Sequence, residues 1–187
     1  MMKYFTPSWK QFHTDIHTLT EKIAKDKQQF DLIVGIARGG LTVSHIVSDF
    51  LRLPVASFTV SSYRNLKRQE LSEITHPVGG NLKHKRVLLI DDCSDSGKTF
   101  LRGIEHLQEL GAQSIATGAV YIKPWTSYTP HYFAQSVDRW IVFPFDIRDT
   151  IVDVSGFMKK EGKTTKQIEQ KLRTLKIPDS YIKKYFR

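Results

Sequence analysis

The sequence RVLLIDDCSDSGKTF occupies residues 86–100 and joins a continuous apolar run to a polar, glycine-containing turn. The run RVLLI has the composition of a buried strand, and the residues after Gly97 have the period of a helix. A turn between a strand and a helix directs backbone N–H groups and the positive end of the helix dipole at one anion, ideally a terminal phosphate. The residues of this turn are Asp95, Ser96, Gly97, Lys98 and Thr99.

Two neighbouring carboxylates, those of Asp91 and Asp92, stand where the same strand ends. They would repel a phosphate, but they suit sugar hydroxyls and water molecules bound to Mg²⁺. The whole segment therefore predicts a site for a Mg²⁺-bound phosphorylated sugar.

Two other interpretations of this segment fit less well. A nucleotide-hydrolysing P-loop also ends in Gly-Lys-Thr, the sequence of residues 97–99. That motif needs a glycine where Asp92 stands, however. Acidic pairs also bind magnesium in prenyl-transfer enzymes, where the pair lies on a helix. Here the pair ends a strand, so neither alternative is favoured.

The rest of the chain alternates apolar runs with segments of helical period. Strands that are apolar on both faces and alternate with helices form a parallel sheet covered on both sides. We therefore predict an α/β fold, with a mostly parallel twisted sheet flanked by helices. Ligands of such sheets bind beyond the carboxyl ends of the strands. The expected strands are 30–37, 54–63, 86–91, 114–123 and 139–145, and the expected helices are 8–25, 41–53 and 99–111.

A polar connection separates Tyr63 from Lys85. It is too long for a structureless connection in a compact domain unless it works as a lid. We predict a mobile lid loop for this segment.

Composition limits the class of protein. The chain has 187 residues, 40% hydrophobic and 25% charged, which fits an ordinary globular domain. It has no run of about 18 apolar residues, and its start lacks the apolar core of a signal peptide, so we expect a cytoplasmic protein without a membrane partner. The single cysteine, Cys93, excludes an internal disulfide and a cysteine-based zinc site.

The net charge of +9 is concentrated in the tail. Residues 159–187 contain ten Lys or Arg and three acidic residues, a balance of +7, which leaves +2 for the rest. Ile168, Leu172 and Leu175 have helical spacing, and the pattern breaks near Pro178. The tail either docks through this apolar face or binds nucleic acid through its charge. We favour docking, because no recognition motif accompanies the charge.

The stretch VLLIDDCSDSGKT resembles the phosphoribosyl pyrophosphate (PRPP) signature of the type I phosphoribosyltransferases. Further segments are similar to the bacterial xanthine-guanine enzymes of that family, over about residues 4–150. Ser96 stands where threonine is commoner, and Phe145 where those enzymes have tryptophan. We therefore expect a phosphoribosyltransferase domain over 1–150 and a basic helical extension over 151–187. The similar segments are VGIARGGL (34–41), VSSYRNLKRQEL (60–71), YIKP (121–124) and DRWIVFPFD (138–146).

The resemblance implies roles for the residues around both phosphate groups. The turn at Asp95–Thr99 would bind the 5′-phosphate, and Asp91 and Asp92 the ribose hydroxyls and Mg²⁺ through water. A second loop would bind the departing pyrophosphate, and a non-proline cis peptide is implied near Ala37–Arg38. The residues of this second loop are Ala37, Arg38, Gly39 and Gly40.

The resemblance also implies how the base is held. Members that act on 6-oxopurines carry an acid at the position of Asp95, which would handle the proton at purine N7. A cap for the following helix is the alternative role of Asp95. Lys123 would contact the 6-oxo oxygen. Trp140 would lie against the base, with backbone groups of Ile141 or Asp146 near the 2-substituent, although a tryptophan there also fits an ordinary core. The lid residues would be Ser62, Tyr63 and Arg68.

The expected reaction is transfer of ribose 5-phosphate from PRPP to guanine, xanthine or hypoxanthine, with release of pyrophosphate. Family members are usually dimers or tetramers, so a homo-oligomer is expected. The alternative is a nucleotide-sensing regulator that keeps this fold and binds nucleic acid through its tail. The intact Asp95 and Lys123 favour the enzyme, because a sensor needs no catalytic base.

Overall fold

The computed structural model describes residues 3–64 and 67–186, and the side chains of residues 61–72 lie outside that description. The chain divides into two compact units. We call residues 13–138 the larger unit, and residues 1–12 together with 139–187 the smaller unit. Helix α1 (Trp9–Lys25) begins in the smaller unit and continues into the larger one.

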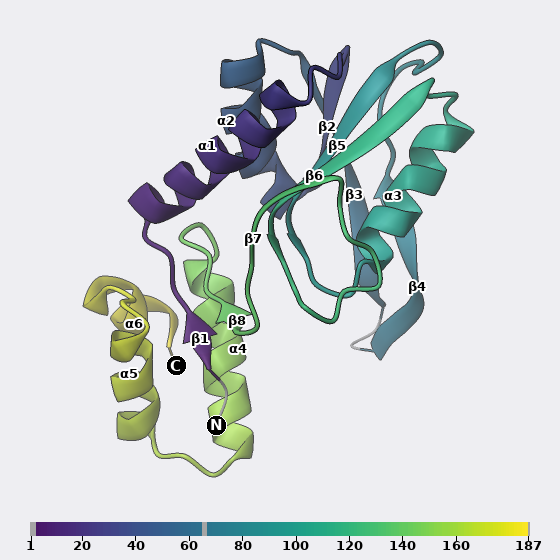
Figure 1. Cartoon of the computed structure of the whole chain (residues 1–187). Helices are drawn as coiled ribbons and strands as arrows, with labels where there is room; N and C mark the ends of the chain where they lie inside the picture. Colours follow the sequence, from purple (N-terminus) through teal and green to yellow (C-terminus); the bar gives the residue numbers. More distant parts are fainter. Residues whose placement is uncertain (1–2, 65–66, 187) are drawn as a thin grey trace. The chain divides into compact units, whose positions relative to one another are not determined.

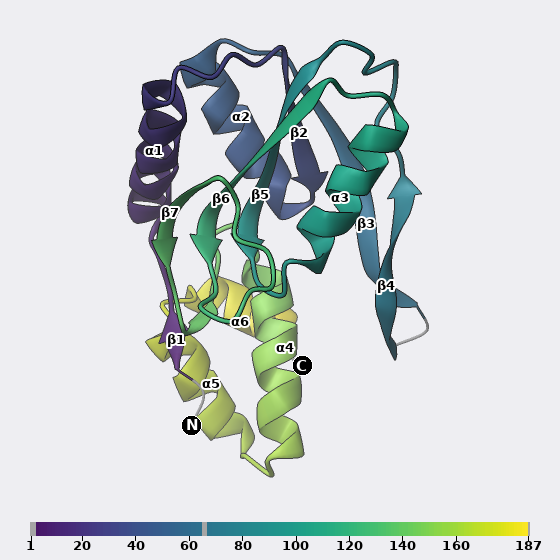
Figure 2. The same cartoon turned by 45° about the vertical axis from the view of Figure 1, so that its right-hand side comes forward.

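The larger unit is built on a sheet of six strands in the order β4-β3-β2-β5-β6-β7. All neighbouring pairs are parallel except β3 and β4, which are antiparallel. Figures 1 and 2 show α2 and residues 13–25 of α1 on one face of this sheet and α3 on the other. The elements are β2 (Leu32–Ala37), α2 (Gly39–Leu51), β3 (Val55–Arg64), β4 (Lys67–His76), β5 (Arg86–Ser94), α3 (Lys98–Glu109), β6 (Ser114–Ile122) and β7 (Tyr132–Ser136).

The centre of this sheet is β5, the strand from the stretch quoted first. Its residues Val87 to Ile90 are fully buried, because helices cover both faces of a parallel sheet. On one face, a Cβ added to Gly103 of α3 would come within 2.9 Å of Phe58 and 3.1 Å of Leu89. The helix therefore packs closely on the sheet, and the expected α/β architecture is confirmed.

Two strands of the larger unit differ from the expectation. The polar segment predicted as a loop contains β4, which forms a hairpin with β3 at the edge of the sheet. Its polar sequence, KRQELSEITH, has no continuous apolar run by which a strand could be recognised. At the other edge, the half-buried β7 was also missed.

The strand predicted at 139–145 was too long and was assigned to the wrong sheet. Only Trp140–Ile141 form a strand, β8, which pairs in parallel with β1 (Tyr4–Phe5) in the smaller unit. The apolar residues that follow serve a different core: Phe143 and Phe145 contact the ring of Phe12, at centroid distances of 5.8 and 5.5 Å. An apolar run does not reveal by itself which core buries it.

The smaller unit has its own core, made by the tail helices α4 (Ile147–Lys160), α5 (Thr165–Thr174) and α6 (Asp179–Tyr185). α4 runs across the boundary expected between residues 150 and 151. Thr164 and Gln167 form a reciprocal capping box at the start of α5. The buried apolar residues include Val142, Ile151, Val154, Ile168, Leu172, Leu175, Ile177 and Ile182. The apolar face predicted for the tail is therefore buried.

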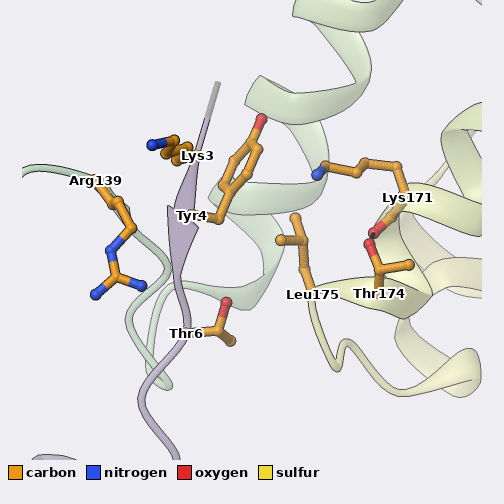
Figure 3. A pocket seen from close by; sticks show the side chains of 7 residues that line it. All are labelled: Lys3, Tyr4, Thr6, Arg139, Lys171, Thr174 and Leu175. Atoms are coloured by element: carbon orange, nitrogen blue, oxygen red, sulfur yellow. Dashed lines mark hydrogen bonds between the residues drawn. The ribbon is translucent and has the colours of Figure 1, made fainter. Parts of the chain in front are cut away.

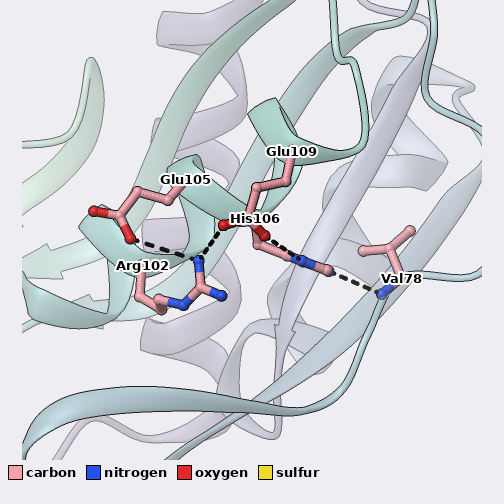
Figure 4. A network of polar contacts seen from close by, with 5 residues as sticks. All are labelled: Val78, Arg102, Glu105, His106 and Glu109. Atoms are coloured by element: carbon pink, nitrogen blue, oxygen red, sulfur yellow. Dashed lines mark hydrogen bonds and ion pairs between the residues drawn. The ribbon is translucent and has the colours of Figure 1, made fainter.

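The segment that follows β4 is anchored to α3 by a buried histidine (Figure 4). The backbone N–H of Val78 donates to Nε2 of His106 at 3.2 Å, so this ring accepts the bond in its neutral form. Nδ1 of His106 lies 3.8 Å from Glu109, whose carboxylate also pairs with Arg102. Burial, and then the charge of Arg102, lower the pKa of His106 below its usual value.

We expect this histidine to make folding stability pH-dependent. The unfolded chain binds the proton more readily, so the free energy of unfolding should fall as the pH drops through about 6.5 towards the native pKa. The loss should be about 1 kcal/mol, the usual worth of one hydrogen bond. Urea unfolding of the wild type and of His106→Gln measures this loss. The two pH values are 7.5 and 5.5, about one unit either side of the usual histidine pKa. The glutamine carbonyl can still accept from Val78, so an equal pH dependence in both proteins would contradict the assignment.

Candidate active site

The two glycines that follow β2 and begin α2 lie directly against the acidic pair near the end of β5. A Cβ added to Gly39 would fall 2.0 Å from Oδ2 of Asp92, and one added to Gly40 would fall 2.5 Å from the carbonyl oxygen of Ile90. Only glycine allows this close approach. The peptide bond between Ala37 and Arg38 is cis, as the resemblance implied. The structure thus brings together two segments that lie about 50 residues apart in sequence.

Asp91 and Asp92 differ in burial where β5 meets the start of α2. Asp91 is buried, and its Oδ1 accepts a hydrogen bond from the Asp92 N–H at 2.9 Å. Burial, and then the charge of Asp92, raise the pKa of Asp91, while a hydrogen bond from the Gly40 backbone opposes the rise. Carboxylate oxygens beside a turn that admits phosphate oxygens are a donor set that suits Mg²⁺. The residues present therefore fit the metal that the resemblance implies.

The predicted phosphate turn leads into α3 with its helix N-terminus uncapped. The cap residue is Gly97, at φ 82°, and no side chain caps it. A Cβ there would lie 2.6 Å from the backbone nitrogen of Tyr128, so the position requires glycine on two counts. The first amide of α3, that of Lys98, donates to the hydroxyl of Ser96 at 3.4 Å. Within the described part of the chain, the amides of Thr99 and Phe100 show no partner and are available for an anion.

Asp95 is not the cap of α3, which corrects one of its two interpretations. Its Oδ1 instead accepts a hydrogen bond from the indole Nε1 of Trp125 at 3.0 Å. Trp125 was missed by sequence reasoning. The available signal was its place directly after Lys123 and Pro124, at the carboxyl end of β6.

A turn after β6 forms the second wall of the site. The Lys123 N–H donates to the carbonyl of Ser94 at 3.0 Å, and the hydroxyl of Ser127 donates to the carbonyl of Ser96 at 2.6 Å. The hydroxyls of Ser94 and Thr126 are 2.9 Å apart. The turn is therefore fixed to the phosphate turn on both sides of Asp95.

Lys123 is buried, with 6% of its surface exposed. Burial lowers the pKa of its ammonium, and the negative charges of Asp95 and Asp138 oppose that effect. Its Nζ lies 5.6 Å from the ring centre of Trp125. Asp95 therefore bonds to the N–H edge of an indole whose face lies beneath the Lys123 ammonium, which places a carboxylate and an ammonium at one end of the sheet.

The other residues predicted to hold the base belong to the smaller unit. Trp140 is 47% exposed, so it is not an ordinary core residue. Its backbone N–H donates to the carbonyl of Lys3 at 3.0 Å. Ile141 is buried, and Asp146 is the residue before α4. The side chains of the predicted lid residues Ser62, Tyr63 and Arg68 lie outside the described residues.

The smaller unit also contains a basic pocket of about 380 Å³ (Figure 3). The ammonium of Lys171 lies 4.4 Å from the ring centre of Tyr4, and the guanidinium of Arg139 is 5.3 Å from that of Phe5. Figure 3 shows Arg139 directed away from Lys171, so these cations do not converge on one anion. The lining residues are Lys3, Tyr4, Thr6, Arg139, Lys171, Thr174 and Leu175.

The fold and the two glycine-containing turns at the carboxyl end of its sheet define a class of protein. A family model described as the phosphoribosyl transferase domain matches residues 8–150. The chain belongs to the phosphoribosyltransferase family and is an enzyme of that class. Among the described residues, no helix has both the length and the apolar character needed to cross a bilayer.

Solved structures with the same fold include a purine phosphoribosyltransferase from Pyrococcus horikoshii Ot3. It is 38% identical, the match covers 77% of this chain and 94% of that one, and the TM-score is 0.69. A hypothetical protein from Neisseria gonorrhoeae with bound ppGpp is 22% identical, with 87% and 99% covered and a TM-score of 0.70. Helicobacter pylori xanthine-guanine-hypoxanthine phosphoribosyltransferase is 20% identical, with 82% and 99% covered and a TM-score of 0.69. At these lower identities the last two show the fold alone.

Proposed function

We propose that this enzyme transfers ribose 5-phosphate from PRPP to a 6-oxopurine and releases pyrophosphate. The observation that carries the proposal is the pair formed by Asp95 and Lys123 at the carboxyl end of the sheet, where Asp95 accepts from the indole N–H of Trp125 and Lys123 lies over the same ring. A 6-oxopurine presents N7 and O6 on the same edge, so a proton acceptor and a cationic donor side by side match that edge. The 38% identical purine phosphoribosyltransferase supports the choice of a purine.

The chain's own groups account for each part of the proposed reaction. The uncapped start of α3 binds the 5′-phosphate, and the glycine loop at Gly39–Gly40 receives the pyrophosphate as the C1′–O bond breaks. N9 of the base then bonds to C1′ of an oxocarbenium-like sugar, while the N7 proton passes to Asp95. Lys123 donates to O6, where negative charge develops.

Mg²⁺, bound with PRPP, would neutralise charge on the departing pyrophosphate. Asp91 and Asp92 would hold it through water or through the ribose hydroxyls. Their carboxylates lie beside the loop proposed for pyrophosphate, which supports this placement.

Further parts of the proposal concern the base, the lid and the assembly. Trp140 would lie against the purine, with Ile141 or Asp146 near its 2-substituent. The hairpin that contains Ser62, Tyr63 and Arg68 would cover the site and exclude water, which competes for the electrophilic sugar. We also propose that the protein is a homo-oligomer. Light scattering coupled to size-exclusion chromatography would measure its mass in solution.

A direct assay tests the proposal. Purified protein with PRPP and Mg²⁺ is expected to convert guanine, xanthine or hypoxanthine into the nucleoside monophosphate, measured by chromatography together with released pyrophosphate. Adenine should be a poor substrate, and excess EDTA should stop turnover. Preferential use of adenine would contradict the 6-oxopurine proposal. PRPP binding without turnover of any purine would favour the regulator instead.

Among the described residues of the tail, the contacts favour packing over nucleic-acid binding. Tyr185, an aromatic residue suited to stacking on bases, is stacked on Tyr181 with ring centres 6.0 Å apart. The guanidinium of Arg148 and the ammonium of Lys184 lie 5.6 and 5.2 Å from the Tyr185 ring centre. These aromatic and basic groups engage one another, which supports packing of the tail as its role.

A further inference from the structure

We infer that Trp125 is a positioning residue for the proposed reaction, whose indole N–H orients the Asp95 carboxylate towards the purine. The inference rests on the proposed function, because it takes Asp95 as the group that receives the N7 proton.

Packing does not explain this tryptophan. Trp125 is 60% exposed, so it gains little of the burial energy that normally retains a tryptophan. Its specific contacts are instead the hydrogen bond to Asp95 at 3.0 Å and the ammonium of Lys123 at 5.6 Å from its ring centre. Both partners are the residues proposed to meet the purine edge.

The backbone holds the indole in place. The Thr126 N–H donates to the Lys123 carbonyl at 3.1 Å, which closes a turn with Trp125 inside it. The same turn is bonded to the carbonyls of Ser94 and Ser96, the two neighbours of Asp95 in the chain. Hydrogen bonds on both sides of Asp95 therefore fix the position of the Trp125 indole relative to the Asp95 carboxylate.

The hydrogen bond from Trp125 gives the two carboxylate oxygens of Asp95 different roles. Oδ1 accepts from the indole, and within residues 3–64 and 67–186 the structure shows no hydrogen bond to Oδ2. Oδ2 is therefore available for the proton from N7. An indole N–H only donates and carries no charge, so it can stay bonded before and after the carboxyl group takes the proton. A cation in its place would hold the carboxylate in its ionised form and make it a poorer base.

Steady-state kinetics of Trp125→Phe tests the inference. The variant keeps an aromatic ring beside Lys123 and removes the donor, so kcat should fall about tenfold, within the range for a hydrogen bond to a charged group. The KM for PRPP should not change, because the bond that is lost goes to the Asp95 carboxylate, whereas the groups proposed to bind the 5′-phosphate are backbone amides at the start of α3. Trp9→Phe is the matched control, since Trp9 is also largely exposed, at 54%, and should leave kcat unchanged.

A double-mutant cycle separates positioning from a structural role. In the Asp95→Ala background, Trp125→Phe should cost nothing further, because the carboxylate that it orients is gone. An unchanged kcat in the single Trp125→Phe variant overturns the inference. A loss of the same size in the Asp95→Ala background overturns it as well.

The indole N–H signals in ¹⁵N-labelled protein give a readout that does not depend on turnover. Trp125→Phe identifies the signal of Trp125 by its loss, and Asp95→Ala should move that signal while those of Trp9 and Trp140 stay in place. An unmoved Trp125 signal would overturn the inference even in an active enzyme. Absence of turnover in wild type with every purine would instead overturn the proposed function, and the inference with it, before any variant is made.

Discussion

Replacing Asp95 with asparagine is expected to lower kcat by about 100-fold or more, the usual contribution of a general base. Asparagine has the same shape, and its amide oxygen can still accept from the Trp125 indole, so the local geometry should survive. The amide cannot take the N7 proton, however. Initial rates at saturating PRPP and purine, with PRPP binding measured separately by calorimetry, check the prediction. PRPP affinity should remain near normal.

Asp49→Asn is the matched control for the loss of one carboxylate. Asp49 is exposed on α2 and is no part of the proposed site. Its substitution should leave kcat unchanged. A fully active Asp95→Asn enzyme would remove Asp95 from the proposed proton transfer, whatever the activity of the control.

Replacing Lys123 is expected to weaken purine binding by about 30-fold, which corresponds to a hydrogen bond between a charged donor and a buried acceptor. In Lys123→Ala the 6-oxo oxygen of the bound purine would have no partner in the closed site, whereas the proposed PRPP contacts would all remain. The dissociation constants of purine and PRPP, measured separately by calorimetry, give the comparison.

Because the Lys123 side chain is buried, the alanine variant also leaves a cavity. Lys123→Met keeps most of the side-chain volume and lacks only the ammonium, so it should lose purine affinity to the same extent. Lys85→Ala is the control, because its exposed side chain precedes β5, at the opposite end of the sheet from the site. A methionine variant that binds purine normally would show that Lys123 acts by packing. An equal loss for both ligands would show that it does not read the base.

Several parts of the site were predictable because their chemistry is local in sequence. The turn at Asp95–Thr99 has its strand, glycine and helix within fifteen residues, so the sequence alone indicated an anion site. Gly39 and Gly40 were singled out as glycines that allow close approach, and in the structure the group that approaches them is the end of β5. The same parallel-sheet logic placed Lys123 at the carboxyl end of β6.

Tertiary contacts decided the features that sequence reasoning missed. The hydrogen bond between Trp125 and Asp95 joins residues thirty positions apart, and nothing in either local sequence specifies it. The apolar run at 139–145 was assigned to the main sheet, whereas β8 pairs with Tyr4–Phe5 from the start of the chain. Sequence by itself thus determined the α/β class and the glycine-containing turn between β5 and α3, because short-range periodicity and turn chemistry encode them. Only the tertiary structure decided which core buries each apolar run and which donor bonds to the Asp95 carboxylate, because both depend on contacts between distant segments.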